Sequence, residues 1–224
     1  IPLEQQELAG TRVLYHDLFT NGILYLDLAM DLHVLPQELL QLVPLFARAL
    51  TDMGTDDEDY VKLSQRIGRK TGGIGHSMLI GTRLEGGASE ARLVLRGKAT
   101  IEQTPDLLDI LRDILLKVNL DNRDRFLQMV LEDKAGSEAS LVPGGHGVAN
   151  GRLRASLGEA DWLGEQLGGV SYLFFLRRLE QRVRHDWPAV LSDLQQLRGL
   201  LLNRAAIVCN ATMDGEGWRD LQPQ

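Results

Sequence analysis

The sequence predicts an α+β fold in which helices cover one face of an antiparallel-rich sheet. Between residues 12 and 101, two β-prone runs, two helical segments and two further β-prone runs follow one another in the order ββααββ. The spacing of apolar residues is then helical from residue 104 to residue 203, and a β-prone run returns at residues 205–212. Strands that come first, a block of helices and a returning strand are typical of this fold class.

The first two strands are predicted to form a β-hairpin. Arg12 to Phe19 is a β-prone run, Asn21-Gly22 is a favoured two-residue turn, and Ile23 to Leu32 alternates between apolar and other residues. Because neighbouring side chains of a strand point to opposite faces, the apolar residues of the second strand share one face. They are Leu24, Leu26, Leu28, Met30 and Leu32. That face needs a cover of helices.

Two helices are expected to supply the cover. The first begins at Pro36 and ends before Gly54, and the second begins at the acidic run Asp56 to Asp59 and ends at Lys70. Two strands then follow, with a turn between them. The two strands and the turn are Gly73 to Arg83, Ala91 to Ile101 and Glu85 to Ser89.

The helical block contains five predicted helices. They are Leu107 to Val118, Asp121 to Ala139, Ala149 to Ser156, Ser171 to His185 and Pro188 to Asn203. A glycine-rich break, Pro143 to Gly147, separates the second helix from the third. After the returning strand, Asp214 to Trp218 reads as a turn, so residues 214–224 are expected to begin a last helix that the sequence cuts short.

Length and composition favour a single domain over residues 1–224, with residues 1–10 as an inter-domain linker. A chain of 224 residues that is 44% hydrophobic buries a sizeable core without disulfides. The break at Pro143 to Gly147 has helical sequence on both sides and is therefore expected to be a loop within that domain. The chain does not begin with Met, so we expect it to be part of a longer polypeptide.

Charge and hydropathy argue against two classes of partner. The chain has 24 Lys and Arg against 31 Asp and Glu, and its net charge of -7 does not favour nucleic acid. It has no apolar run of about 18 residues, so no membrane span is expected. Cys209 is its one cysteine, which excludes an internal disulfide and a cysteine-type metal site. Because Cys209 lies in an apolar, β-prone run of residues, its thiol is expected to be buried and unreactive.

No motif for catalysis, metal binding or cofactor binding is present. The patterns HExxH, HxxEH, GxSxG and SxxK do not occur, and none of the five histidines has a partner at a helical metal-binding spacing. The glycine-rich run at residues 71–77 precedes a strand, whereas a phosphate loop precedes a helix. We therefore predict no catalytic residue, no metal ligand and no cofactor site within this chain.

Two basic clusters and a loop histidine are candidates for docking or peptide contact. The candidates are Arg66, Arg69, Lys70, His146, Arg177 and Arg178. The alternative for the cations is a solvated surface with ion pairs along each helix, and the alternative for His146 is a hydrogen bond to the backbone. The sequence leaves both interpretations open.

Three segments of the chain have a distinctive sequence, namely Gln65 to Gly73 (QRIGRKTGG), Pro143 to Gly147 (PGGHG) and Gly168 to Glu180 (GGVSYLFFLRRLE). They resemble presequence-protease-type members of the inverzincin, or pitrilysin-like, zinc metallopeptidases. The resemblance extends from Thr20 to Asn210 and points to the third of the family's four homologous domains, the family-associated non-catalytic domain. It implies a pitrilysin/mitochondrial-processing-peptidase-like fold.

In that family, the four domains form two bowl-shaped halves that are joined by a hinge and close around a peptide chamber. The zinc site lies in the first domain and a catalytic Arg/Tyr pair in the fourth, and this chain matches neither set. The resemblance therefore implies a wall of the chamber that docks to sibling domains, in a zinc metalloendopeptidase that degrades unfolded peptides such as cleaved targeting presequences. Zinc is expected in the catalytic domain of the parent protein and not here. The acidic balance would suit basic peptides.

Two alternatives stay open. A degenerate pitrilysin fold without peptidase activity could act as a stand-alone scaffold or interaction domain, and an independent enzyme would need a site that the motifs do not provide. The sequence gives no compartment, although the resemblance allows the bacterial cytoplasm and the organelle matrix or stroma. This 224-residue chain alone is expected to be inactive.

Overall fold

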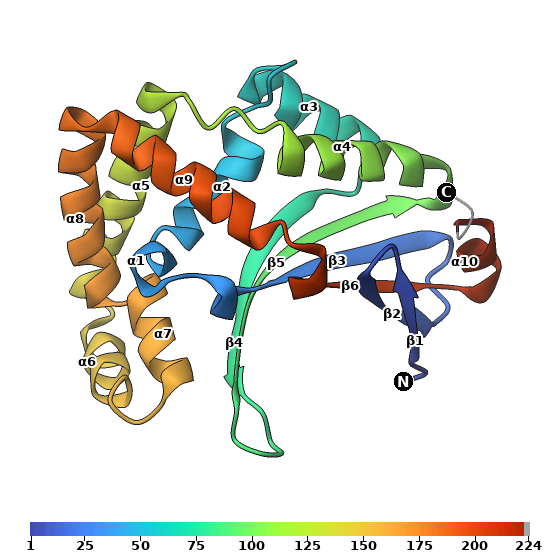
Figure 1. Cartoon of the computed structure of the whole chain (residues 1–224), viewed down its shortest axis with the longest axis horizontal. Coiled ribbons are helices and arrows are strands. Elements are labelled where there is room, and N and C mark those ends of the chain that lie inside the picture. Colours follow the sequence, from blue (N-terminus) through green and yellow to red (C-terminus); the bar gives the residue numbers. More distant parts are fainter. Residues whose placement is uncertain (222–224) are drawn as a thin grey trace.

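A six-stranded sheet with the strand order β1-β2-β6-β3-β5-β4 is the base of the structure, a computed structural model that describes residues 1–221 (Figure 1). The strands are β1 (Glu4–Leu8), β2 (Thr11–Asp17), β3 (Ile23–Asp31), β4 (Ile74–Thr82), β5 (Ser89–Thr100) and β6 (Ile207–Met213). All neighbouring strands pair antiparallel except β2 and β6, which pair parallel. The predicted α+β class with an antiparallel-rich sheet is confirmed.

The predicted hairpin between the first two strands is wrong in its pairing. Asn21 and Gly22 do form a turn, with φ of 54° and 74°, as this dipeptide favours. However, β6 lies between β2 and β3 and is hydrogen-bonded to both. Residues 18–22 join β2 to β3 and are enough to cross two strand spacings of about 4.8 Å each. The turn therefore reverses the chain without deciding which strand becomes the neighbour.

The N-terminal segment also differs from the expectation of a linker. Residues 4–8 form the edge strand β1, and a turn at Ala9 and Gly10, both with positive φ, leads into β2. The sequence of β1, EQQEL, has no apolar alternation because its side chains are largely exposed. Backbone pairing with β2, from Glu4 opposite Tyr15 to Leu8 opposite Thr11, holds this strand in the sheet.

The helices follow the predicted order with a few differences. They are α1 (Gln37–Leu40), α2 (Val43–Asp52), α3 (Tyr60–Lys70), α4 (Thr104–Leu116), α5 (Arg123–Leu141), α6 (Gly145–Arg154), α7 (Glu159–Gly168), α8 (Val170–His185), α9 (Trp187–Leu201) and α10 (Gly215–Leu221). Short 3-10 helices occur at Leu32–Val34, Ile101–Gln103 and Arg204–Ala206.

Three helical segments depart from the prediction. The helix expected from Pro36 is divided into α1 and α2, because Pro44 has no N–H to continue the helical hydrogen bonds. α6 begins at Gly145, inside the expected break, so His146 lies in its first turn. α7 was not predicted, since Gly164 and Gly168 weaken its helical signal. α10 begins the expected last helix, and residues 222–224 lie outside the described residues.

The helices cover one face of the sheet, as predicted. Side chains on that face include Leu24 on β3 and Leu93 on β5, which are 3% and 0% exposed, and they pack in one core with Phe46 of α2 and Phe126 of α5. The small helix α10 joins the same layer, because Trp218 stacks on the buried ring of Tyr15 with ring centroids 4.5 Å apart. Figure 1 shows the sheet with this layer beside it.

The connection between α2 and α3 depends on Gly54. This residue has φ +80°, and a Cβ atom there would lie 2.6 Å from the carbonyl oxygen of Glu58 and 2.8 Å from the backbone nitrogen of Tyr60. Asp59 then caps α3 by accepting hydrogen bonds from the N–H groups of Val61 and Lys62. The predicted helix boundary at Gly54 is therefore confirmed, and close backbone contact adds to the positive φ.

α3 is fastened to α4 by an ion pair with little exposure. Arg66 of α3 donates a hydrogen bond of 2.8 Å to Asp113 of α4 and lies 3.1 Å from Glu58. Burial alone would raise the pKa of Asp113, but the hydrogen bond from Arg66 and the charge of Lys117 outweigh it and lower that pKa below its ordinary value. The carboxylate form of Asp113 therefore stabilises the folded state.

We expect Gly54→Ala to lower the free energy of unfolding by about 2 kcal/mol, because the new Cβ adds left-handed strain and contacts fixed backbone atoms. Gly68→Ala is the matched control. Gly68 lies in α3 with no atom within 4 Å of the built Cβ, so the same change there should stabilise the protein by about 0.5–1 kcal/mol. Urea denaturation of the two variants measures both effects, and equal effects would contradict this role of Gly54.

Asp113→Asn is expected to destabilise the protein by about 1–2 kcal/mol at neutral pH, because Arg66 loses its charged acceptor. Since the folded pKa of Asp113 is depressed, the difference from wild type should be constant above the ordinary carboxylate pKa of 3.8 and should disappear as pH falls through the lower folded value. Denaturation curves across acid pH measure this. Asp109→Asn, in an exposed pair with Arg112, should change stability by less than about 0.5 kcal/mol. A pH-independent difference for Asp113→Asn would contradict the assignment.

Candidate functional site

The sheet face opposite the helices carries a polar surface that no described helix covers. Cross-strand pairing aligns Leu14, Asn210, Asp27, Arg96 and Gly75 in one row across five strands. Within this row Asp27 is the acceptor for two neighbours, Arg96 at 2.9 Å and Asn210 at 3.4 Å. We call this surface the open face.

Two hollows lie on the open face. The first, of about 530 Å³, is lined by Tyr25, Asp27, Arg96, Lys98, Asn210 and Thr212, together with Gly73 to Ser77 at the margin of β4. The second, of about 720 Å³, is lined by residues of β1, β2, β5 and β6 and of the segment before β6, among them Arg12, Asp31 and Arg92. Both hollows are wide and are lined mainly by polar residues and glycine, which suits contact with an extended chain more than enclosure of a small ligand.

Charges of the two signs balance on the open face. Within the six strands, the residues that the pairing places on this face include four cations and four anions. They are Arg12, Arg92, Arg96 and Lys98, and Glu7, Asp27, Asp31 and Glu90. The net charge of -7 therefore arises from other parts of the chain. An acidic attraction for basic peptides, which the composition suggested, is not a property of this face.

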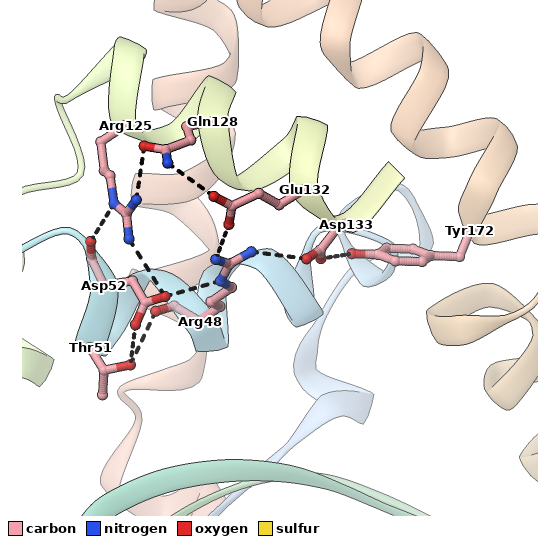
Figure 2. Close-up of polar contacts among 8 residues, drawn as sticks. All are labelled: Arg48, Thr51, Asp52, Arg125, Gln128, Glu132, Asp133 and Tyr172. Carbon is pink, nitrogen blue, oxygen red and sulfur yellow. Dashed lines mark hydrogen bonds and ion pairs between the residues drawn. The ribbon is translucent and has the colours of Figure 1, made fainter. Parts of the chain in front are cut away.

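A cluster of polar side chains lies between the helices of the helical layer (Figure 2). Arg48 of α2 donates hydrogen bonds to Asp52 and Asp133, each 3.0 Å long, and also to Glu132. The hydroxyl of Tyr172 on α8 donates to Asp133 at 3.1 Å. Figure 2 shows these side chains converging from α2, α5 and α8. The network thus fastens three helices to one another.

The protonation states in this network suit a structural role. Burial, with the nearby charge of Asp133, raises the pKa of Tyr172 far above its ordinary value, so the phenol remains a hydrogen-bond donor at neutral pH. Arg125 extends the network by donating to the carbonyl oxygen of Asp52 at 2.9 Å and to Gln128 at 2.9 Å. Each charged group is paired with a partner of the opposite sign, and no free base or nucleophile faces a cavity in this network.

The predicted docking residues are placed on three different helices. Arg66 is engaged between Glu58 and Asp113, so its charge serves the contact between α3 and α4. Lys70 lies 3.3 Å from Asp106, and both groups are about half exposed. Arg69 is exposed and donates to the carbonyl oxygen of Gln65, at 3.4 Å.

His146 and the arginines of α8 are more accessible. His146 is exposed in the first turn of α6. Arg177 pairs with Glu138 of α5 at 2.9 Å and lies over the ring of Phe174, whereas Arg178 is exposed on the same helix. Because α3 lies apart from α6 and α8 (Figure 1), the six candidates do not form one site. A docking role for each of them stays a prediction.

The structure contains no metal cluster in its described part. Among residues 1–221, no three His, Cys, Asp or Glu side chains are arranged to hold a metal ion. The thiol of Cys209 is half-buried, and burial together with the charge of Asp27 raises its pKa to about 11. A thiol with that pKa is a poor nucleophile at neutral pH. None of the described helices has the length and apolarity needed to cross a membrane.

Comparison with known protein sequences supports the resemblance. The family model for the associated domain of M16 peptidases, subfamily C, matches residues 1–179. Presequence protease 1, chloroplastic/mitochondrial, of Arabidopsis thaliana is 39% identical over 222 residues, which are 99% of this chain and 21% of that protein. Protein HypA of Clostridium perfringens is 30% identical over 207 residues, covering 91% of this chain and 21% of HypA. The chain thus spans about a fifth of the length of these relatives.

Solved structures give the same fold. A conserved protein from Enterococcus faecalis V583 aligns with a TM-score of 0.68 at 13% identity, over 99% of this chain and 50% of the other. A peptidase M16 inactive domain from Pseudomonas fluorescens also aligns with a TM-score of 0.68, at 14% identity, over 96% of this chain and 47% of the other. The sequence match shows to which family the chain belongs, and the two solved structures show that its fold is pitrilysin-like. The chain belongs to the family of domains associated with subfamily C of the M16 peptidases, the non-catalytic associated domain of presequence-protease-type metallopeptidases.

Proposed function

We propose that this chain forms part of the wall of a closed peptide chamber in a zinc metalloendopeptidase that degrades unfolded peptides, such as cleaved targeting presequences. Its open face lines the chamber, and its other surfaces dock to sibling domains of the same polypeptide. Zinc and the catalytic residues belong to those sibling domains. The chain supplies enclosure and positions no reacting group.

The observation that carries this proposal is the one-sided sheet. Helices bury most of one face, whereas the open face is hollowed, rich in polar residues and left uncovered by any described helix. A chamber wall needs a surface of this kind, since hydrated peptides of varied sequence must slide along it without being trapped by a large apolar patch. The chain also matches relatives named presequence protease over about a fifth of their length, which is consistent with one domain among several.

Docking to sibling domains is supported by exposed apolar side chains outside the open face. They include Val142, Leu153, Leu157 and Phe174, which are 90%, 73%, 79% and 48% exposed and belong to α5, α6 and α8 or to the ends of these helices. Arg177 and Arg178 lie on the same part of α8. This mixture of apolar and basic groups is typical of surfaces between domains of one chain.

The competing function is a stand-alone scaffold with a degenerate fold. Both functions place no zinc in this chain, so they are distinguished by the polypeptide that carries it. An HxxEH motif upstream on the same polypeptide establishes the peptidase, and a full-length polypeptide without that motif would establish the scaffold.

Lys98→Glu in the full-length polypeptide is expected to lower KM for a basic presequence-like peptide about two- to fivefold and to leave kcat unchanged, because it makes the balanced open face acidic. Lys62→Glu, on the exposed outer side of α3, is the matched control and should leave KM unchanged. Steady-state kinetics at low and physiological salt measure both. Equal effects of the two substitutions would contradict the placement of the open face inside the chamber.

The purified 224-residue chain is expected to show no hydrolysis of a fluorogenic peptide, with or without added zinc, because residues 1–221 offer neither a metal cluster nor an activated nucleophile. A fluorescence assay with a chelator control measures this. Cleavage that persists after removal of contaminating metallopeptidases would overturn the non-catalytic assignment.

A further inference from the structure

Strand β4 leaves one side of its backbone without a partner. It is the last strand of the sheet, and among the described strands it pairs only with β5. The N–H of Lys98 donates to the carbonyl oxygen of Gly73, and the N–H of Arg83 donates to that of Ala88. Hydrogen-bonded and non-hydrogen-bonded pairs alternate along an antiparallel ladder, so the odd-numbered residues of β4 are the ones that bond to β5. The N–H and C=O groups of the even-numbered residues, Ile74, His76, Met78, Ile80 and Thr82, therefore point away from the sheet. Among the described residues, no backbone hydrogen bond joins them to another element.

This edge lacks the features that usually protect an exposed strand. Natural edge strands carry charged side chains, proline or a bulge, or they are short. β4 is nine residues long, and its sequence IGHSMLIGT contains no Lys, Arg, Asp, Glu or Pro. Its ladder with β5 runs without a bulge from Ile74 to Thr82. The opposite edge strand, β1, is five residues long and carries Glu4 and Glu7. Only one of the two edges is therefore built to discourage pairing.

Hollows lie on both sides of this edge. On the open face, Gly75, His76 and Ser77 border the hollow of about 530 Å³. On the helix side, Ile80 borders a cavity of about 590 Å³. Four glycines of α6 and α7 form much of its wall, namely Gly147, Gly151, Gly164 and Gly168. The charged groups at this cavity are already paired, Arg154 with Asp161 and Glu165 with Arg152.

We propose that an extended peptide segment binds along β4 as a seventh strand. Its backbone hydrogen-bonds to the even-numbered residues of β4, and its side chains alternate between the polar hollow on the open face and the glycine-lined cavity on the helix side. When a peptide adds to a sheet as a strand, main-chain hydrogen bonds supply the affinity, and pockets for every second side chain supply the selectivity. The ligand is thus an unfolded peptide with apolar side chains at every second position and polar ones between them.

A second copy of β4 fits this edge less well. Antiparallel self-pairing would place Gly75, Ser77, Leu79 and Gly81 on the open-face side, and among these side chains only Leu79 is large enough to fill part of a hollow. A peptide with larger side chains fills the hollows on both sides. The inference rests on the proposed function only in taking unfolded peptide as the partner, and the wall role does not require this edge to bind anything.

His76→Pro tests the proposal on the 224-residue chain. The N–H of His76 points away from β5, so proline removes a donor for the added strand and no bond of the sheet. The probe is a fluorescein-labelled peptide as long as the nine-residue β4, with leucine at alternate positions and serine or threonine between them. Fluorescence anisotropy should show binding to wild type and binding at least about fivefold weaker to His76→Pro. His76→Ala, which removes the same side chain and keeps the N–H, should bind within about twofold of wild type.

A second arm uses wild-type protein and a probe that is N-methylated at alternate amides. Its binding should be weakened at least as much as by His76→Pro, and this arm decides the matter if that variant fails to fold. Equal binding by His76→Pro and His76→Ala, equal binding of the two probes, or no binding of either probe would overturn the proposal. So would sedimentation that shows a wild-type dimer dissociated by His76→Pro, because the edge would then belong to a second copy. Failure here leaves the wall role to be judged by the Lys98→Glu kinetics in the full-length polypeptide.

Discussion

The pairing of β6 between β2 and β3 is the constraint on which the rest of the structure depends. β6 comes from the C-terminal end of the described chain and is hydrogen-bonded on both sides, to Arg12–Asp17 in parallel and to Tyr25–Met30 in antiparallel register. Without β6, the β1–β2 hairpin would have no bond to the remaining strands. A long segment of chain separates β6 from β2 and β3, but the entropic cost of closing a loop grows only slowly with its length. Two strand ladders and the burial of Ala211 and Met213 offset this cost and hold β6 in place. The hydrogen bond from Tyr15 to the carbonyl oxygen of Met213 adds to this junction.

The apolar face of the strands determines where the helices lie. The chain leaves the sheet after β5 and returns at β6, and the helical block between these two strands packs on that face. Hydrogen-bonded ion pairs then join the helices to one another. Arg66 donates to Asp113 between α3 and α4, and Arg48 donates to Asp133 between α2 and α5. No described helix covers the other face of the six strands. The open face is therefore a consequence of the packing of the helices on one side and needs no special loop.

Patterns of neighbouring residues predict most helices and strands correctly. They do not reveal contacts between residues that are far apart in the sequence. The Asn21-Gly22 turn, the positive φ at Gly54 and the cap at Asp59 each involve neighbouring residues, and periodicity located the helical block. By contrast, the insertion of β6 depends on pairing across the whole chain, and β1 has no apolar pattern to announce a strand. The sequence leaves Arg66 open as a docking residue or as part of a solvated basic surface, because its acceptor, Asp113, lies on another helix. The row of Asn210, Asp27 and Arg96 likewise requires a register that no single strand encodes.

The distribution of charge constrains how a wall of this kind could act on peptides. Four cations and four anions cancel on the open face, and Arg96 and Asp27 neutralise each other directly at 2.9 Å. The net charge of -7 therefore belongs to the other surfaces, where water and salt screen it. A face with balanced charge neither concentrates nor repels a peptide of either sign, so its contribution under the proposed wall role is steric and hydrogen-bonding. Sequence preference would then have to come from elsewhere, and β4, the uncharged strand with unpaired backbone groups at the margin of this face, is the element where the chain offers both hydrogen bonds and pockets.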